Sequence, residues 1–140
     1  AFPKIKDFLE GMSRAGVKQG FIKTFAPWGR TRWFDDWMPR GMDMATKGRI
    51  ERVSKNTPIQ GTAADMTKHA LVLCYDYIKN NNIPVELVMT VHDQIDTTCP
   101  RDYAEEWAAK LKELMEEAAE HIMGNDLLKA EVEITDKWSK

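Results

Sequence analysis

The chain has 140 residues, of which 43% are hydrophobic and 30% are charged, and these proportions are ordinary for one globular domain with an apolar core. It contains no run of 18 or more apolar residues, which argues against a membrane span, and its N-terminus shows no basic-then-apolar signal-peptide pattern. The net charge of −2 is unevenly placed, because residues 1–56 hold 12 Lys and Arg against 6 Asp and Glu, whereas residues 57–140 hold 8 against 16. This division fits a protein that touches a polyanion on one side and holds cations on the other, although a solvated basic face is at least as common.

The first half of the chain predicts helical and extended segments without a long regular core element. It opens with Ala rather than Met and runs directly into a helical pattern, which we interpret as a chain cut from a longer one. The predicted elements are a helix at 2–15, an extended segment at 17–34 that turns at Pro27-Trp28-Gly29, a loop at 35–44 and a short helix at about 45–54.

The second half predicts long helices and strands. Its elements are a helix at 62–80, strands at 85–91 and 94–99, an amphipathic helix at 101–122 and a last strand at 130–134. These elements indicate an α+β fold in which a small antiparallel sheet of three strands packs with two long helices, preceded by a helical and extended segment. The acidic face of the helix at 101–122 is interpreted as a solvated surface.

His92 and Asp93 lie between the two central strands, and a tight hairpin there would hold the Asp93 carboxylate at an exposed tip. Mg²⁺ prefers hard oxygen ligands and usually takes one or two protein carboxylates together with phosphate oxygens. Asp93 could therefore supply half of a two-metal phosphoryl-transfer site. Gln94 is neutral and adds no charge, and a His-Asp pair is also a common turn dipeptide with no function.

Basic and amide side chains gather before the helix at 62–80. They could clamp phosphates, stack on bases or donate to minor-groove acceptors, but scattered surface arginines and a capped helix start explain them equally well. The candidates for contact with nucleic acid are Arg30, Arg52, Asn56 and Gln60.

Two segments together make the chain recognisable. The block Asn56-x-Pro58-Ile59-Gln60-Gly61-x-Ala63-Ala64-Asp65, preceded by Glu51-Arg52 and followed by Val91-His92-Asp93, resembles the family A DNA polymerases of the bacterial DNA polymerase I type. Gly29-Arg30 is similar to that family's Gly-Arg-Arg turn, and Val132-Glu133-Ile134 with Trp138 is similar to its closing strand and Trp. The resemblance covers essentially all 140 residues.

The resemblance implies a role for each matching position. Asp93 would be one of two catalytic metal-binding Asp residues of a palm domain, and His92 would lie near the primer terminus. Arg52, Asn56 and Gln60 would contact the minor groove of the primer–template, and Arg30 its backbone. The cofactor would be Mg²⁺ in a two-metal site, and the substrates would be primer–template DNA and deoxynucleoside triphosphates.

The chain departs from the family pattern in two ways. The family usually has Glu after His-Asp, where this chain has Gln94, and an amide there can still support the site by holding a water or a hydrogen bond. The family's other catalytic Asp and its triphosphate-binding fingers helix have no candidate here, so we expect them in a missing N-terminal part or in a complementing chain. Accordingly, residues 1–55 are predicted to be a fingers-derived segment, and residues 56–140 a palm portion.

The function predicted from these residues is the C-terminal portion of a DNA-directed DNA polymerase, inactive by itself, in the cytoplasm of a bacterium or a phage-infected host. Two alternatives stay open. The chain could be a fragment that binds duplex DNA without catalysis, or a plain α+β interaction domain whose motifs are unused.

Overall fold

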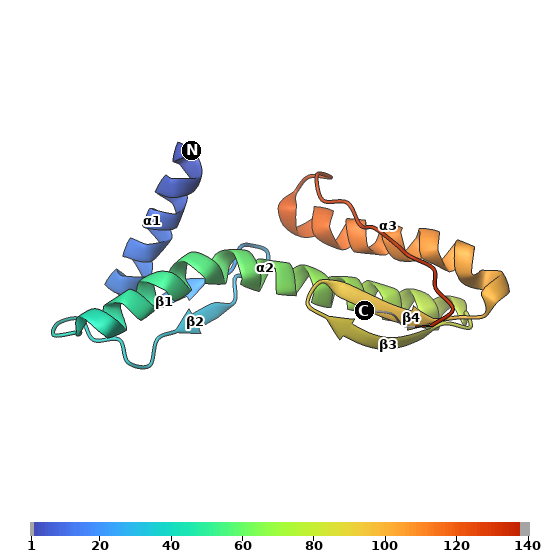
Figure 1. Ribbon diagram of the computed structural model, residues 1–140, viewed down its shortest axis with the longest axis horizontal. Coiled ribbons are helices and arrows are strands. Elements are labelled where there is room, and N and C mark those ends of the chain that lie inside the picture. Colours follow the sequence, from blue (N-terminus) through green and yellow to red (C-terminus); the bar gives the residue numbers. More distant parts are fainter. Residues whose placement is uncertain (1, 138–140) are drawn as a thin grey trace. The chain divides into compact units, whose positions relative to one another are not determined.

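The computed structural model describes residues 2–137 and divides into two compact units, Ala1–Ala63 and Ala64–Lys140 (Figure 1). The predicted boundary between residues 55 and 56 lies eight positions before this division, and the assignment of the two parts to fingers and palm stays a prediction. Among the described residues, no helix combines the length and the apolar character needed to cross a membrane.

The first unit begins with a helix and a short hairpin. Helix α1 (Pro3–Gln19) ends where Gly20 adopts a φ of 79° and donates its N–H to the carbonyl of Gly16, a left-handed cap that favours glycine. Strands β1 (Phe21–Lys23) and β2 (Thr31–Trp33) then pair antiparallel, as the extended segment with its central turn predicted.

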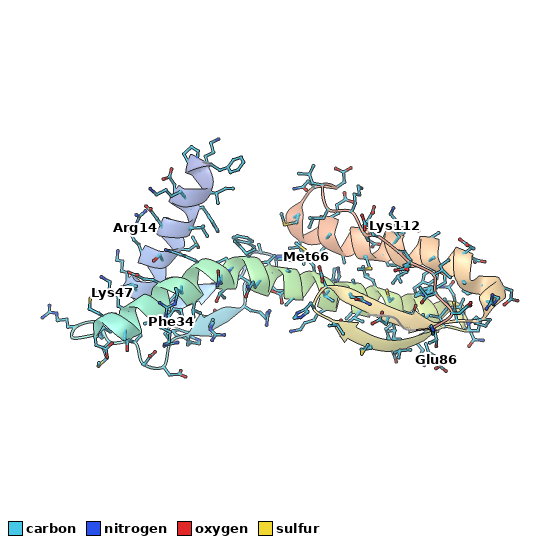
Figure 2. All side chains as sticks on the ribbon, viewed as in Figure 1. Arg14, Phe34, Lys47, Met66, Glu86 and Lys112 are labelled. Atoms are coloured by element: carbon cyan, nitrogen blue, oxygen red, sulfur yellow. The ribbon has the colours of Figure 1, made fainter. Side chains whose placement is uncertain are left out.

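The core of this unit is small. Its three buried apolar side chains come from the hairpin, the residue that follows it and the next helix. They are Ile22, Phe34 (labelled in Figure 2) and Ile50.

The prediction of two helices separated by a break near Pro58 is wrong, because α2 runs without interruption from Met44 to Asn81. Pro58 has no N–H for the carbonyl of Ser54, and a proline inside a helix costs about 3 kcal/mol. The helix continues because Ile50, Ser54, Pro58 and Thr62 form one stripe of side chains that are all buried. Tertiary burial of this stripe therefore outweighs the local preference for a break.

The second unit is built on a hairpin and a helix. Strands β3 (Glu86–Val91) and β4 (Gln94–Thr98) pair antiparallel, a short 3₁₀ turn η1 (Arg101–Tyr103) follows, and α3 (Ala104–Met123) returns along the hairpin (Figure 1). Its core joins the last part of α2, the hairpin and α3. The buried members are Ala70, Cys74, Val85, Ile95, Trp107, Leu111, Leu114 and Ala118.

The predicted third strand at 130–134 does not form, so both sheets in the described part of the chain have two strands. The Glu116 carboxylate of α3 accepts the backbone N–H of Ala130 at 3.1 Å and the ammonium of Lys129 at 3.3 Å. These bonds hold the segment against the helix, and Val132 and Ile134 remain 36% and 48% exposed. The fold is α+β as predicted, but its sheets are smaller, and Trp138 lies outside the described residues.

Candidate nucleic-acid interface and metal-binding turn

The turn between β3 and β4 has the tight geometry that the sequence predicted. Val91 pairs with Gln94, so His92 and Asp93 alone form the loop. His92 has a φ of 55°, a left-handed conformation that two-residue hairpins demand and that His tolerates better than most residues. Both side chains are exposed, and the Asp93 carboxylate is therefore open to a ligand.

The carboxylates near this turn do not form a complete metal site. Among residues 2–137, no three His, Cys, Asp or Glu side chains are grouped so that they could hold a metal ion. Asp93 offers hard, exposed oxygens suited to Mg²⁺, but it is a single anionic ligand. Asp93 therefore suits a magnesium site as one ligand among several, and the other anionic ligands would have to come from elsewhere.

Gln94 is engaged along its own strand rather than at the turn. Residues two apart on a strand share a face, and the Gln94 amide Nε2 donates to Asp96 Oδ1 at 2.6 Å. Asp96 is half-buried, and its other carboxylate oxygen is buried without a hydrogen-bond partner. This amide–carboxylate pair was not among the predicted contacts, although the i, i+2 spacing of a Gln and an Asp on a predicted strand was a sequence signal for it.

Three of the predicted DNA-contacting residues lie on one face of α2. Arg52, Asn56 and Gln60 are spaced four residues apart, and all three are exposed. At 100° per residue this row is about 160–200° away from the buried row that contains Ser54 and Pro58. We call Arg52, Asn56 and Gln60 the amide stripe, and burial of the opposite face makes it face solvent.

Arg30, the fourth predicted residue, comes from the turn between β1 and β2. Its guanidinium Nη2 donates to the carbonyl of Gly61 at 3.2 Å, directly beside Gln60 in the chain. The structure therefore brings Arg30 to the end of the amide stripe, within the unit Ala1–Ala63. Asp93 belongs to the other unit, Ala64–Lys140.

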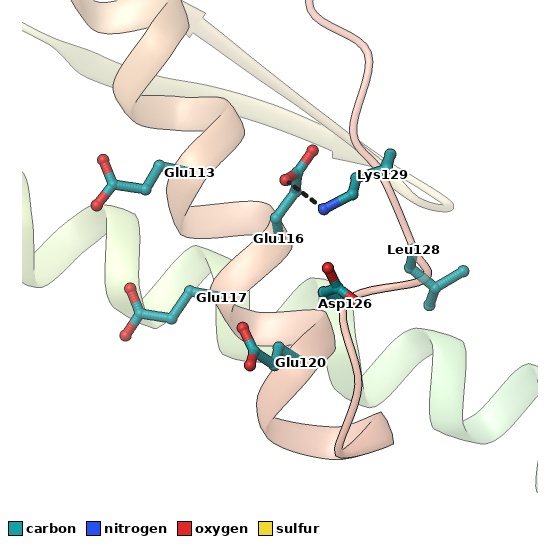
Figure 3. Close-up of a pocket in the computed structure, with 7 residues that line it drawn as sticks. All are labelled: Glu113, Glu116, Glu117, Glu120, Asp126, Leu128 and Lys129. Carbon is teal, nitrogen blue, oxygen red and sulfur yellow. Dashed lines mark hydrogen bonds and ion pairs between the residues drawn. The ribbon is translucent and has the colours of Figure 1, made fainter.

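An open pocket follows the acidic face of α3 in the second unit. Figure 3 shows Glu116 and Lys129 joined across it. Its lining residues are Glu113, Glu116, Glu117, Glu120, Asp126, Leu128 and Lys129. The N–H of Ala130 and the ammonium of Lys129 lower the pKa of Glu116, so its charge serves the fold.

His69 and His121, which lie far apart in the sequence, form a ring pair within the second unit. Their ring centroids lie 5.0 Å apart, one on α2 and one on α3. Burial lowers the pKa of His69, and the neighbouring His121 lowers it further, while Glu117 opposes the shift. Two histidines on separate helices carry no sequence signal of their contact.

Comparison with known proteins shows which family the chain matches. Residues 1–140 match the family described as DNA polymerase family A. The thermostable DNA polymerase I of Thermus filiformis is 35% identical over 118 residues, which are 84% of this chain and 13% of that protein. The DNA polymerase of Bacillus phage SP01 is 32% identical over 120 residues, 86% of this chain and 13% of the phage protein. The chain thus spans about an eighth of the length of these curated relatives.

A solved structure shares the fold as well. The polymerase domain of Pol1 from M. smegmatis, in complex with a DNA primer–template and a dNTP, superposes with a TM-score of 0.71 at 26% identity. The likeness covers 81% of this chain and 19% of the solved chain.

Proposed function

Because the chain belongs to the family A DNA polymerases, we propose that it is the C-terminal portion of an enzyme that adds deoxynucleotides to a primer 3′ end under the direction of a template. The observation that carries this proposal is the likeness of its fold to a polymerase domain solved with a primer–template and a dNTP. The substrates would be primer–template DNA and deoxynucleoside triphosphates. Bacterial and phage relatives support a reaction in the cytoplasm of a bacterium or a phage-infected host.

The turn between β3 and β4 would hold the reacting groups. Asp93 would bind Mg²⁺ through its exposed carboxylate, and His92 would lie beside the primer terminus. When bound, two Mg²⁺ ions would activate the primer hydroxyl and stabilise the leaving pyrophosphate. Gln94 would support the turn through its bond to Asp96, and its amide oxygen can still accept a bond from water.

Asp93 alone cannot complete this site. A two-metal site needs more anionic ligands, and the triphosphate needs fixed positive charges. We propose that a second Asp and the triphosphate-binding side chains come from another part of the polymerase or from a complementing chain. The 140 residues by themselves would then not extend a primer.

The amide stripe and Arg30 would bind the primer–template. Minor-groove acceptors lie at similar places in every base pair, so donors from Arg52, Asn56 and Gln60 can sense correct pairing without reading sequence. Arg30 would contact a backbone phosphate, a role that suits a guanidinium. The exposure of all four residues supports this assignment.

The test is the substitution Asp93→Asn in the complete polymerase. It should lower kcat to less than about a tenth of the original value. The dissociation constant of the primer–template should stay unchanged, because the metal held by Asp93 would stabilise the transition state and not the bound DNA. Asp76→Asn also removes an exposed carboxylate, from α2, and is the matched control. A variant that retained more than a tenth of the activity would contradict the assignment of Asp93.

Assays on the 140 residues alone separate the remaining readings. Salt-dependent duplex binding without extension agrees with an incomplete polymerase, and it favours a purely binding fragment if the complete protein is inactive as well. Absence of duplex binding at low salt would favour a plain α+β interaction domain. Template-directed extension by a monomer would contradict the incomplete site.

A further inference from the structure

The β1–β2 hairpin meets α2 at Gly61 and Thr62, one and two residues beyond Gln60, and two buried threonines lie at this contact. Thr24 and Thr62 are 7% and 3% exposed. The Thr62 hydroxyl donates to the carbonyl of Pro58 and accepts the backbone N–H of Phe25 at 3.0 Å. The Thr24 hydroxyl accepts the backbone N–H of Arg30 at 2.9 Å. We call Thr24, Gly61 and Thr62 the hairpin clasp.

Gly61 lets the hairpin approach the helix closely. A Cβ at Gly61 would lie 2.5 Å from the Cγ2 methyl of Thr24, a separation that real side chains do not adopt. The guanidinium of Arg30 then reaches the Gly61 carbonyl at 3.2 Å. The clasp thus contains a steric contact, three hydrogen bonds made by hydroxyl groups and one made by a guanidinium.

The clasp lies directly after the point where α2 is locally weakest. Pro58 provides no N–H for the carbonyl of Ser54, so the helical ladder loses that bond in the turn that carries Asn56 of the amide stripe. The Thr62 hydroxyl bonds the Pro58 carbonyl from the next turn and ties it to the hairpin at Phe25. The relative placement of Asn56, Gln60 and Arg30 therefore depends on the clasp as well as on the helix itself.

We propose that Thr62 is a positioning residue, which sets Gln60 and Arg30 in the geometry that binds the minor groove and backbone of a primer–template duplex. This inference rests on the proposed function. Thr62 is buried and would not touch DNA, so its effect would pass through Gln60. Removal of its hydroxyl leaves the N–H of Phe25 without its acceptor and frees the turn that bears the stripe.

The experiment compares Thr62→Val with Thr62→Ser, using a fluorescein-labelled primer–template and fluorescence anisotropy over a range of salt concentrations. Valine keeps the shape and removes the hydroxyl, and we expect binding about three- to tenfold weaker, the range that corresponds to one lost hydrogen bond. Serine keeps the hydroxyl and should restore most of the affinity. Thr57→Val, the same substitution five residues earlier at a half-buried position of α2 outside the hairpin clasp, is the matched control and should change affinity less than twofold.

A double-mutant cycle with Gln60→Ala distinguishes positioning from general stability. If Thr62 acts through Gln60, Thr62→Val should cost little additional affinity once Gln60 is Ala. Equal losses in both backgrounds would overturn the inference. Circular dichroism establishes whether the Thr62→Val variant is folded. If it is unfolded, Gly61→Ala replaces it in the same cycle, because the added methyl group would displace Thr24 and disturb the clasp while the Thr62 hydroxyl stays in place.

The cycle also separates this inference from the proposed function. If neither Gln60→Ala nor Arg52→Ala weakens binding, the proposed DNA interface is wrong. If both weaken binding and Thr62→Val does not, only the positioning role is wrong.

Discussion

The two units of this chain are stabilised in different ways. Ala64–Lys140 has eight buried apolar residues in one cluster, whereas Ala1–Ala63 has three. The first unit instead relies on close backbone approaches, in which Gly16 meets Ser54, Gly20 meets Trp37 and Gly61 meets Thr24. At each of these glycines, a side chain added by substitution would clash with the neighbour, so the first unit should be sensitive to added volume at these positions.

The charges divide along the same boundary. Ala1–Ala63 holds 12 Lys and Arg against 6 Asp and Glu, and Ala64–Lys140 holds 8 against 16. The amide stripe and Arg30 belong to the basic unit, and the Asp93 turn belongs to the acidic one. The proposed DNA interface is therefore built on small, closely packed residues, and the proposed metal ligand on an apolar core.

The largest expected effect tests the apolar core. Trp107 is 2% exposed, and its indole N–H donates to Thr97 Oγ1 at 2.8 Å. Trp107→Ala should lower the free energy of unfolding by about 3–5 kcal/mol, since it removes a large buried side chain and leaves a cavity. Urea denaturation measures it, with Trp33→Ala, at a tryptophan 66% exposed, as the control. Equal losses for both variants would mean that Trp107 is not a core residue.

Two glycines of α1 test whether close approach matters in the first unit. A Cβ at Gly16 would lie 1.9 Å from Ser54 Oγ, whereas a Cβ at Gly11 meets nothing within 4 Å. Gly16→Ala should destabilise by about 1–3 kcal/mol through overpacking. Gly11→Ala should stabilise by up to about 1 kcal/mol, because alanine favours a helix. Thermal unfolding of both variants measures the contrast, and a change of the same sign at both positions would contradict it.

A smaller effect on stability is expected at Gln94, the first residue of β4 after the His92-Asp93 turn. Gln94→Glu would place a second carboxylate against Asp96 Oδ1, which now accepts the amide of Gln94 at 2.6 Å. Like charges on one strand face repel, so the variant should unfold at lower urea concentration, and Asp96→Asn added to it should reverse the loss. In the complete polymerase, we expect the variant to be tolerated with an altered dependence on Mg²⁺ or Mn²⁺. Inactivation at every metal concentration would reveal a role of Gln94 beyond these contacts.

The smallest expected effect is a dependence of stability on pH. The pKa of His69 in the folded chain lies below its ordinary value of 6.5, because of burial and then His121. The unfolded chain therefore binds a proton first, so stability falls as the pH falls through 6.5 toward the lower folded pKa. His69→Gln should flatten this part of the profile, measured by urea denaturation between pH 7.5 and 5.5. An unchanged slope would show that other groups cause the dependence.

Features set by neighbouring residues could be predicted from the sequence. Two runs of β-formers around His92-Asp93 define a hairpin, since strand period and turn geometry are local. The exposure of Arg52, Asn56 and Gln60 would also have followed from their four-residue spacing, had the helix been predicted to continue. The block around Pro58 and the His-Asp turn were sufficient to indicate the family, because the resemblance depends on residue types and their order and not on tertiary contacts.

Only the tertiary structure decided the rest. Pro58 locally favours a break, and burial of Ile50, Ser54 and Thr62 on either side keeps α2 continuous. Residues 130–134 alternate like a strand, yet a strand requires a pairing edge, and in the structure Glu116 of α3 binds the start of this segment. The hairpin clasp and the contact of His69 with His121 likewise join residues far apart in the chain. Local patterns specify what each segment prefers, and burial and hydrogen bonds between distant segments determine which preference is realised.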